Sequence, residues 1–259
     1  MKIYGLLAVI LLYCLAPING QNTTDSTATQ KDTTCKECKE RTNVHTTVYK
    51  TKRYEIRGFM VDLGISTYLN DGNFNLPQSL DVYELNYDRS YHLNVRVFEQ
   101  RINFDKKGYT SISQGLNLEW QNYNFVNDYV FEPRQSMVTP VLSDKRLSKN
   151  RLLTQLVSLP VEFHIESNPK RLSRSFHISA GVIGGLVYRA NQKVKYEDDG
   201  DKNKVRDDFN LNKFRLGWIG RIGYGPINFY VSNSITPLFK SGEGPELIPL
   251  QIGITLIPY

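Results

Sequence analysis

From residue 58 onward, apolar and polar residues alternate along eight stretches of the chain. A period of two predicts β-strands that each carry one apolar and one polar face. We therefore expect an all-β domain. The predicted strands are residues 58–66, 90–97, 111–120, 153–165, 176–189, 214–224, 227–236 and 248–256.

The connections between these strands alternate between long and short. Those at 103–108, 167–173 and 225–226 are short, those at 68–88, 121–151 and 191–212 are long, and the last, at 240–246, is intermediate; we expect the longer connections to be polar. Outer-membrane barrels have an even number of antiparallel strands, short periplasmic turns and longer extracellular loops. Residues 51–259 are thus predicted to form an eight-stranded antiparallel transmembrane β-barrel of the outer-membrane type, with both termini in the periplasm.

The two faces of the predicted strands differ in a way that assigns the inside of the barrel. The polar faces combine glycines with charged residues, which suits a narrow eight-stranded interior if the charges pair. The apolar faces carry aromatic residues near their ends, as expected of two interfacial girdles. We place the polar faces inside; a soluble barrel with the apolar faces inside is the alternative. The charged residues are Asp62, Arg96, Glu119, Glu162, Arg189, Arg215 and Arg221.

The N-terminal fifth of the chain has a different composition. Residues 1–20 combine Lys2, an apolar run and a final small residue, Gly20, which predicts a signal peptide. Residues 21–50 have few apolar side chains to bury, so we expect a disordered periplasmic linker. It contains Cys35 and Cys38; in an exported chain this pair could form a disulfide, while a redox motif would need a helix start that the surrounding sequence does not offer.

Three groups of residues suggest chemistry, and each has a simpler interpretation. His164, His177 and Glu162 are predicted to face inward on neighbouring strands and are candidates for a metal site. An interior network of hydrogen bonds and ion pairs is the favoured interpretation, because buried charges must be paired. Ser90 and His92, with Asp88 beyond them, would fit a lipid-modifying hydrolase, but no nucleophile-elbow sequence surrounds them.

The third group is the acidic and basic loop at 191–212, which contains a D-x-D-like run but lacks the spaced ligands and the final Glu of an EF-hand. We interpret it as a solvated loop. We therefore predict no catalytic residue, no cofactor and no metal. The net charge of +6 comes from Lys and Arg scattered among Asp and Glu, so nucleic acid is not an expected partner.

Several short motifs resemble the PorT-like outer-membrane β-barrel family of Bacteroidetes, over residues 53–259. They are GFMVDLG at 58–64, LDVYEL at 80–85, GLNLEW at 115–120, LPVEF at 159–163 and TPLFK at 236–240, with the likeness continuing to Gly253. The resemblance implies the barrel fold and a location in the outer membrane. PorT itself belongs to the type IX secretion system, but membership of the family does not by itself imply secretion.

Together these features predict a non-enzymatic barrel of the cell outer membrane with a structural or interaction role in the envelope. Its expected partners are outer-membrane lipid and, through the linker and loops, periplasmic or envelope proteins. The alternatives are a PorT-like accessory role in protein secretion, a soluble ligand-binding barrel and a lipid-modifying enzyme.

Overall fold

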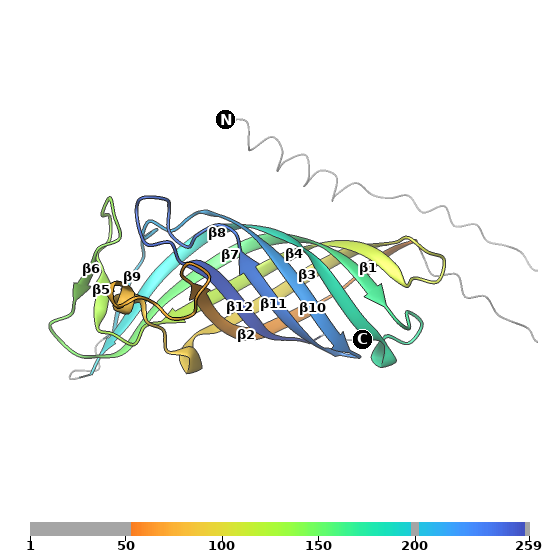
Figure 1. Ribbon diagram of the computed structural model, residues 1–259, viewed down its shortest axis with the longest axis horizontal. Helices are drawn as coiled ribbons and strands as arrows, with labels where there is room; N and C mark the ends of the chain where they lie inside the picture. Colours follow the sequence, from red (N-terminus) through yellow and green to blue (C-terminus); the bar gives the residue numbers. More distant parts are fainter. Residues whose placement is uncertain (1–52, 198–201, 257–259) are drawn as a thin grey trace, which may run out of the picture. The chain divides into compact units, whose positions relative to one another are not determined.

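Eight long strands pair antiparallel in a closed ring in the computed structural model, which describes residues 53–197 and 202–256 (Figure 1). Each strand pairs with the next along the chain, and the last pairs with the first, which closes the barrel. The predicted fold class is therefore confirmed. The strands are β2 (Met60–Leu69), β3 (Tyr91–Asn103), β4 (Thr110–Asn124), β7 (Leu147–Glu166), β8 (Phe176–Tyr196), β10 (Phe214–Tyr224), β11 (Ile227–Ser234) and β12 (Ile248–Leu256).

The remaining elements are short and belong mostly to the long connections. β5 (Tyr129–Phe131) and β6 (Pro140–Leu142) form a hairpin, and β9 (Lys202–Val205) pairs with the end of β8. β1 (Tyr54–Arg57) precedes β2 and pairs with β3. The 3-10 helices are η1 (Gln78–Tyr83), η2 (Tyr87–Arg89) and η3 (Leu172–Arg174).

No helix in the described part of the chain is long and apolar enough to cross a membrane. The predicted signal peptide, the linker and the pair Cys35 and Cys38 lie outside the described residues and stay predictions.

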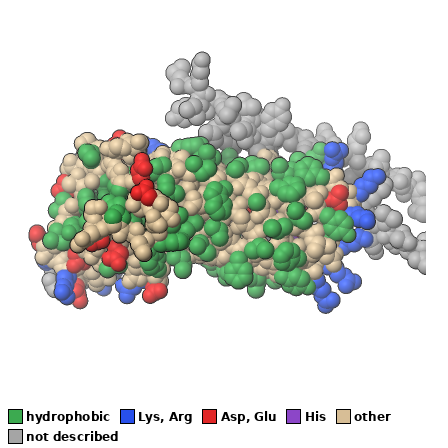
Figure 2. Space-filling view, in the orientation of Figure 1, with side chains coloured by type: hydrophobic (Ala, Val, Ile, Leu, Met, Phe, Trp, Pro, Cys, Tyr) green, Lys and Arg blue, Asp and Glu red, His purple; other side chains and the backbone are tan. Residues whose placement is uncertain are grey.

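The predicted faces of the strands are confirmed, with the exception of Arg189 on β8. Asn94 on β3 and Arg215 on β10 are buried inside the barrel, whereas their neighbours Leu216 and Val95 belong to the outer face. Figure 2 shows hydrophobic side chains gathered over the strands, between two ends that carry most of the charged side chains. An exposed apolar band of this kind fits a lipid environment and not a soluble barrel. By the usual rule, the end with the short turns is periplasmic and the end with the long connections is extracellular.

Two β-bulges within the barrel wall change the alternation, and one of them corrects a prediction. A third register shift, between Leu147 and Lys149, lies at the start of β7. Between Arg96 and Phe98 the register of β3 shifts, so that Glu99 and Arg101 also point inward. Between Gln155 and Leu156 on β7 the register with β8 shifts as well. Beyond that point the buried residues of β8 change parity, and Arg189, predicted to face inward, lies opposite Gln155 on the outer side. An extra residue in one strand reverses the side on which all later residues lie.

Because the apolar band faces lipid, a charge at Val95 should destabilise the barrel. Val95 lies partway along the outer face of β3, between exposed Tyr91 and Ile102. Val95→Arg should lower the free energy of unfolding by about 2–4 kcal/mol near the bilayer midplane, and Val95→Leu should leave it nearly unchanged. Urea unfolding of the refolded chain in lipid, followed by heat-modifiable migration on gels, measures both. A lipid-soluble thiol reagent should label cysteine at Val95 and not at Asn94; the reverse labelling would mean that the faces are assigned wrongly.

Candidate functional site

The inside of the barrel contains a chain of ion pairs that connects most of its buried charges. Glu162 on β7 accepts hydrogen bonds from the guanidinium groups of Arg96 on β3 and Arg221 on β10. Ser179 Oγ donates a third, at 3.1 Å. Glu162 and Arg96 are about 1% exposed, so each charge depends on its partners for stabilisation. The carboxylate therefore joins three strands across the interior.

This network continues from both arginines. Arg221 Nη2 lies 2.7 Å from Asp62 Oδ2 on β2, and Asp62 also accepts hydrogen bonds from Asn94 and Thr255. In the other direction, Arg96 Nη1 lies 2.5 Å from Glu99 Oε2. Acids and bases thus alternate, which is the arrangement that makes burial of several charges possible.

Nearer the periplasmic turns, Arg101 continues the same line of charges. It pairs with Glu99, at 3.0 Å, and with Glu166. Arg57 on β1 reaches Glu166 from the rim of the barrel at 3.3 Å. Ion pairs therefore extend from the middle of the barrel to its periplasmic mouth.

A second polar cluster lies on the extracellular side of the first. Arg215 Nη1 lies 2.7 Å from Glu119 Oε2, and its other nitrogens donate to the hydroxyls of Ser234 and Ser232 and to Gln251. His92 lies 3.5 Å from Glu119 and contacts the hydroxyl of Tyr230 at 2.7 Å.

Tyr230 can lie along the inner wall because its register partners on the next two strands, Gly253 on β12 and Gly64 on β2, have no side chains. A Cβ atom at Gly64 would lie 2.5 Å from the Tyr230 hydroxyl oxygen, and would also meet the backbone of β12. The glycines of the polar faces thus make room for large side chains that reach in from other strands.

The predicted metal candidates take part in this interior network and do not converge on one point. His164 Nε2 lies 2.7 Å from Ser113 Oγ, whereas His177 Nδ1 lies 3.8 Å from Glu166. In the strand register His164 is opposite Ser179 and not His177. The third candidate, Glu162, is held between two arginines. Within residues 53–197 and 202–256, no group of three or more His, Cys, Asp or Glu side chains is placed to hold a metal ion.

The Ser90 and His92 pair is likewise engaged elsewhere. The Ser90 hydroxyl donates to the backbone oxygen of Asn86 at 2.8 Å and accepts from the backbone N–H of Asn124 at 2.9 Å. His92 is turned to Tyr230 and Glu119, as described above. Asp88 lies in η2. No hydrogen bond among the described residues links Ser90 to His92, so the geometry of a nucleophile and its base is not formed.

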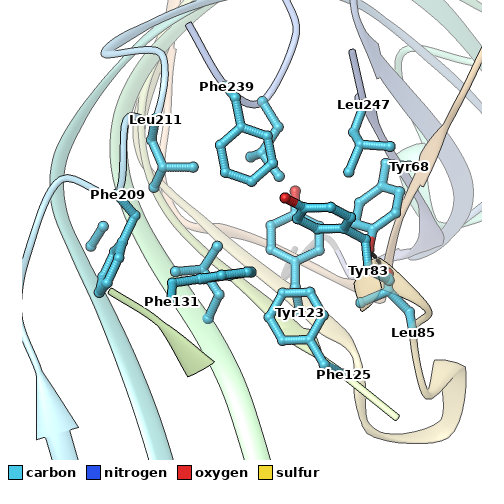
Figure 3. Close-up of a cluster of buried hydrophobic side chains, with 13 residues drawn as sticks. Tyr68, Tyr83, Leu85, Tyr123, Phe125, Phe131, Phe209, Leu211, Phe239 and Leu247 are labelled. Atoms are coloured by element: carbon cyan, nitrogen blue, oxygen red, sulfur yellow. Dashed lines mark hydrogen bonds between the residues drawn. The ribbon is translucent and has the colours of Figure 1, made fainter. Parts of the chain in front are cut away.

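The extracellular end of the barrel is closed by a hydrophobic cap, which the sequence reasoning missed. The cap combines side chains from strand ends with side chains from all four long connections (Figure 3). We had expected these connections to be polar. The buried residues of the cap are Tyr68, Tyr83, Leu85, Tyr123, Phe125, Phe131, Leu152, Ala190, Phe209, Leu211, Leu238, Phe239 and Leu247.

Aromatic contacts hold the cap together around Phe131. Its ring lies 5.3 Å from that of Phe125, 5.9 Å from that of Tyr83 and 6.3 Å from that of Phe209. Such ring pairs contribute beyond the apolar area that they bury. Burial in the cap raises the pKa of Tyr83 to about 12, so its hydroxyl stays protonated.

Polar contacts between the connections fix the outer layer of the cap. The Val138 N–H donates to the Glu243 backbone oxygen at 2.7 Å, and the Arg134 N–H donates to Asp207 Oδ2 at 2.6 Å. Asp207 belongs to the acidic and basic loop at 191–212, and its side chain binds another loop. The centre of that segment, residues 198–201, lies outside the described residues.

The sequence did contain a signal for the cap. Nine aromatic or leucine residues of the long connections are among its members: Tyr83, Leu85, Phe125, Phe131, Phe209, Leu211, Leu238, Phe239 and Leu247. A solvated loop has no reason to hold so many large apolar side chains.

Comparison with known protein families matches residues 57–240 to the outer membrane protein beta-barrel domain. The match covers more than two thirds of the 259 residues, so the chain belongs to this family. None of the curated proteins with which the sequence was compared matches it. Family and closed barrel together establish the outer membrane as the location.

Because Glu162 pairs with two buried arginines, its removal should destabilise the barrel. Glu162→Ala leaves Arg96 and Arg221 buried without their shared partner, and should cost about 3–5 kcal/mol of unfolding free energy. Glu243→Ala is the control, because Glu243 pairs with Lys240 on the surface, where such a pair contributes about 0–1 kcal/mol. Urea titrations of both variants in the same lipid measure the difference. Equal losses for the two would show that the interior ion pairs do not stabilise the barrel.

Proposed function

We propose that this outer-membrane barrel is a non-enzymatic protein with a structural or interaction role in the cell envelope. The observation that supports this most is that its interior is closed at two levels. Ion pairs cross the middle of the barrel, and the hydrophobic cap covers the extracellular end. A barrel of this size has an interior that side chains can fill.

A filled interior moves the possible sites of function to the outside of the barrel. The charges inside are paired with one another and so are not available to a passing solute. Ser90 and His92, the candidates for hydrolysis, bind different partners. The remaining surfaces are the outer face of the cap, the periplasmic turns and the outer wall, and these suit contacts with lipid or with other envelope proteins.

This proposal predicts that the chain conducts no ions. The full-length protein, refolded and inserted in planar lipid bilayers, should show no stepwise conductance, because ion pairs cross the middle of the barrel and the cap covers its extracellular end. A wide porin inserted under the same conditions serves as the control for the recording. Stable conductance steps that depend on the inserted chain would contradict the proposal.

An accessory role in protein secretion is the second candidate, and the PorT-like motifs support it. The periplasmic turns add a physical reason, because they expose basic side chains to which an acidic partner could bind (Figure 2). These are Lys106, Lys107, Lys170, Arg171 and Arg174. The predicted linker at 21–50 would then be a second contact for the same partner. We also propose on the strength of these motifs that the chain is a PorT-like member from Bacteroidetes.

Deletion of residues 22–46 behind an intact signal peptide separates the two candidates. A structural barrel should insert and leave secretion unchanged, which is the result we expect, because the deleted segment has almost no apolar side chain with which to anchor a stable interface. Heat-modifiable migration confirms insertion, and secreted proteins and co-purifying envelope proteins are then compared with the intact chain. Loss of secretion with the barrel still inserted would favour the accessory role.

A further inference from the structure

Six cations form two rows across three neighbouring strands at the extracellular end of the barrel. In the first row Lys149 on β7 is opposite Lys195 on β8, which is opposite Lys202 on β9. In the second row Arg151, Lys193 and Lys204 occupy the same three strands in the same order. Directly opposite residues share one face of a sheet, with Cβ atoms about 5 Å apart. We call these six residues the cationic grid.

The grid lies on the outer face of the sheet. The residues that alternate with it, Asn150, Leu152, Gln192 and Val194, are buried on the inner side. The members of the grid are exposed or half-buried. Figure 1 shows β9 beside the outer ends of β7 and β8, at the end of the barrel that carries the long connections.

Along the barrel axis, the grid lies just beyond the apolar band on the extracellular side. The outer face of β8 is apolar up to Leu186 and Tyr188, which is 56% exposed. Lys193 lies five residues further along the strand, roughly 12 Å higher after allowing for the tilt of barrel strands. Arg189 lies between the two, also on the outer side. Cations thus begin where the apolar band ends, at the level of the lipid headgroups.

Nothing in the described part of the chain neutralises the grid. None of its six residues takes part in an ion pair there, and Nε of both Arg151 and Arg189 is buried without a hydrogen-bond partner. Among the described residues, the acid nearest in sequence is Glu197, exposed beyond the end of β8; Asp198, Asp199 and Asp201, between β8 and β9, lie outside the described residues. Like charges directly opposite each other destabilise a sheet, so the grid lowers the stability of the isolated barrel.

The electrostatic effect of this crowding is visible in two of the lysines. The neighbouring charge of Arg151 lowers the pKa of Lys149, and Arg89, Lys195 and Lys202 add to that effect. Burial lowers the pKa of Lys193, and Arg151 and Lys204 lower it further. An anion placed over the grid would remove this repulsion.

We propose that the cationic grid binds the phosphate groups of a phosphorylated glycolipid, the lipopolysaccharide of the outer leaflet. Position and charge both support this occupant. The lipid A part of such a molecule places phosphates at the headgroup level, and its acyl chains would lie along the apolar band beneath. Lysine and arginine are the side chains that bind phosphate best. The inference rests on the location in the outer membrane, and it is independent of the role proposed above.

The test uses the full-length chain refolded in detergent without lipopolysaccharide and titrated with lipid A that carries two phosphates. Native mass spectrometry counts bound lipid, and the midpoint of heat-modifiable migration reports stabilisation. The variant Lys149→Gln/Lys193→Gln/Lys195→Gln/Lys204→Gln removes four charges from the grid. Its apparent affinity for lipid A should fall by about fivefold per lysine. Added NaCl should weaken binding to the unaltered chain, since salt screens exposed charges.

A matched control removes the same number of charges from the opposite end of the barrel. Lys106→Gln/Lys107→Gln/Lys170→Gln/Arg174→Gln should bind lipid A as the unaltered chain does. The grid variant should itself fold, because it loses like-charge repulsion and no described ion pair. Without lipid A it should therefore unfold at the same temperature as the unaltered chain or at a higher one.

Three results would overturn the proposal. The first is equal binding of lipid A by the grid variant and the unaltered chain. The second is equal binding of lipid A from which the phosphates have been removed, which would indicate contact with the acyl chains alone. The third is equal stabilisation by inorganic phosphate, which would identify a soluble anion and not a lipid as the ligand. The last two need only the unaltered chain, and none of the three bears on the conductance experiment.

Discussion

A narrow barrel can hold charges only if each of them has a partner, and Glu162 shows how this chain meets that requirement. One carboxylate binds arginines from two other strands, and those arginines bind the acids Asp62 and Glu99 in turn. Removing any one member leaves its neighbours without compensation, so the network behaves as a unit. It therefore fixes which strands lie across the interior from one another, in addition to the pairing of their backbones.

The ion-pair network in the middle of the barrel and the hydrophobic cap at its extracellular end are surrounded by different media, lipid and water. Within the membrane span, polar side chains fill the barrel and its buried acids pair with arginines, while the outer surface remains apolar for lipid. At the extracellular end the apolar side chains change sides: Leu152 and Tyr123 point inward and meet the rings of the loops, while the outer surface becomes charged. Residues change sides because the medium outside the wall changes from lipid to water.

Alternation of apolar and polar residues was enough to predict the strands, the closure and the inward position of Glu162. Each strand faces lipid on one side and the polar interior on the other, so its residues must alternate with a period of two. The bulges were missed, although each leaves a trace. Val97 and Phe98 are adjacent apolar residues, as are Val187 and Tyr188, and two apolar residues in succession mark the point where the period changes phase. Arg189 was assigned to the wrong side for this reason.

The cap and the cationic grid could not be predicted in the same way. Rings in loops follow no period, so nothing in the sequence indicates that Phe131 meets Phe209. Lys149 and Lys193 lie far apart along the chain, and they become neighbours only through the pairing of β7 with β8. Contacts that depend on register between distant strands require the structure.

The cap also has a consequence for the order of assembly. Its members come from every long connection, between β2 and β3, β4 and β7, β8 and β10, and β11 and β12. Contacts between segments so distant in the chain form late, after the loops that separate them have closed. Each of these connections must first cross the bilayer, and only then can the rings meet. Once packed, the rings hold the four connections together, so these connections could cross the bilayer again only after the cap had come apart.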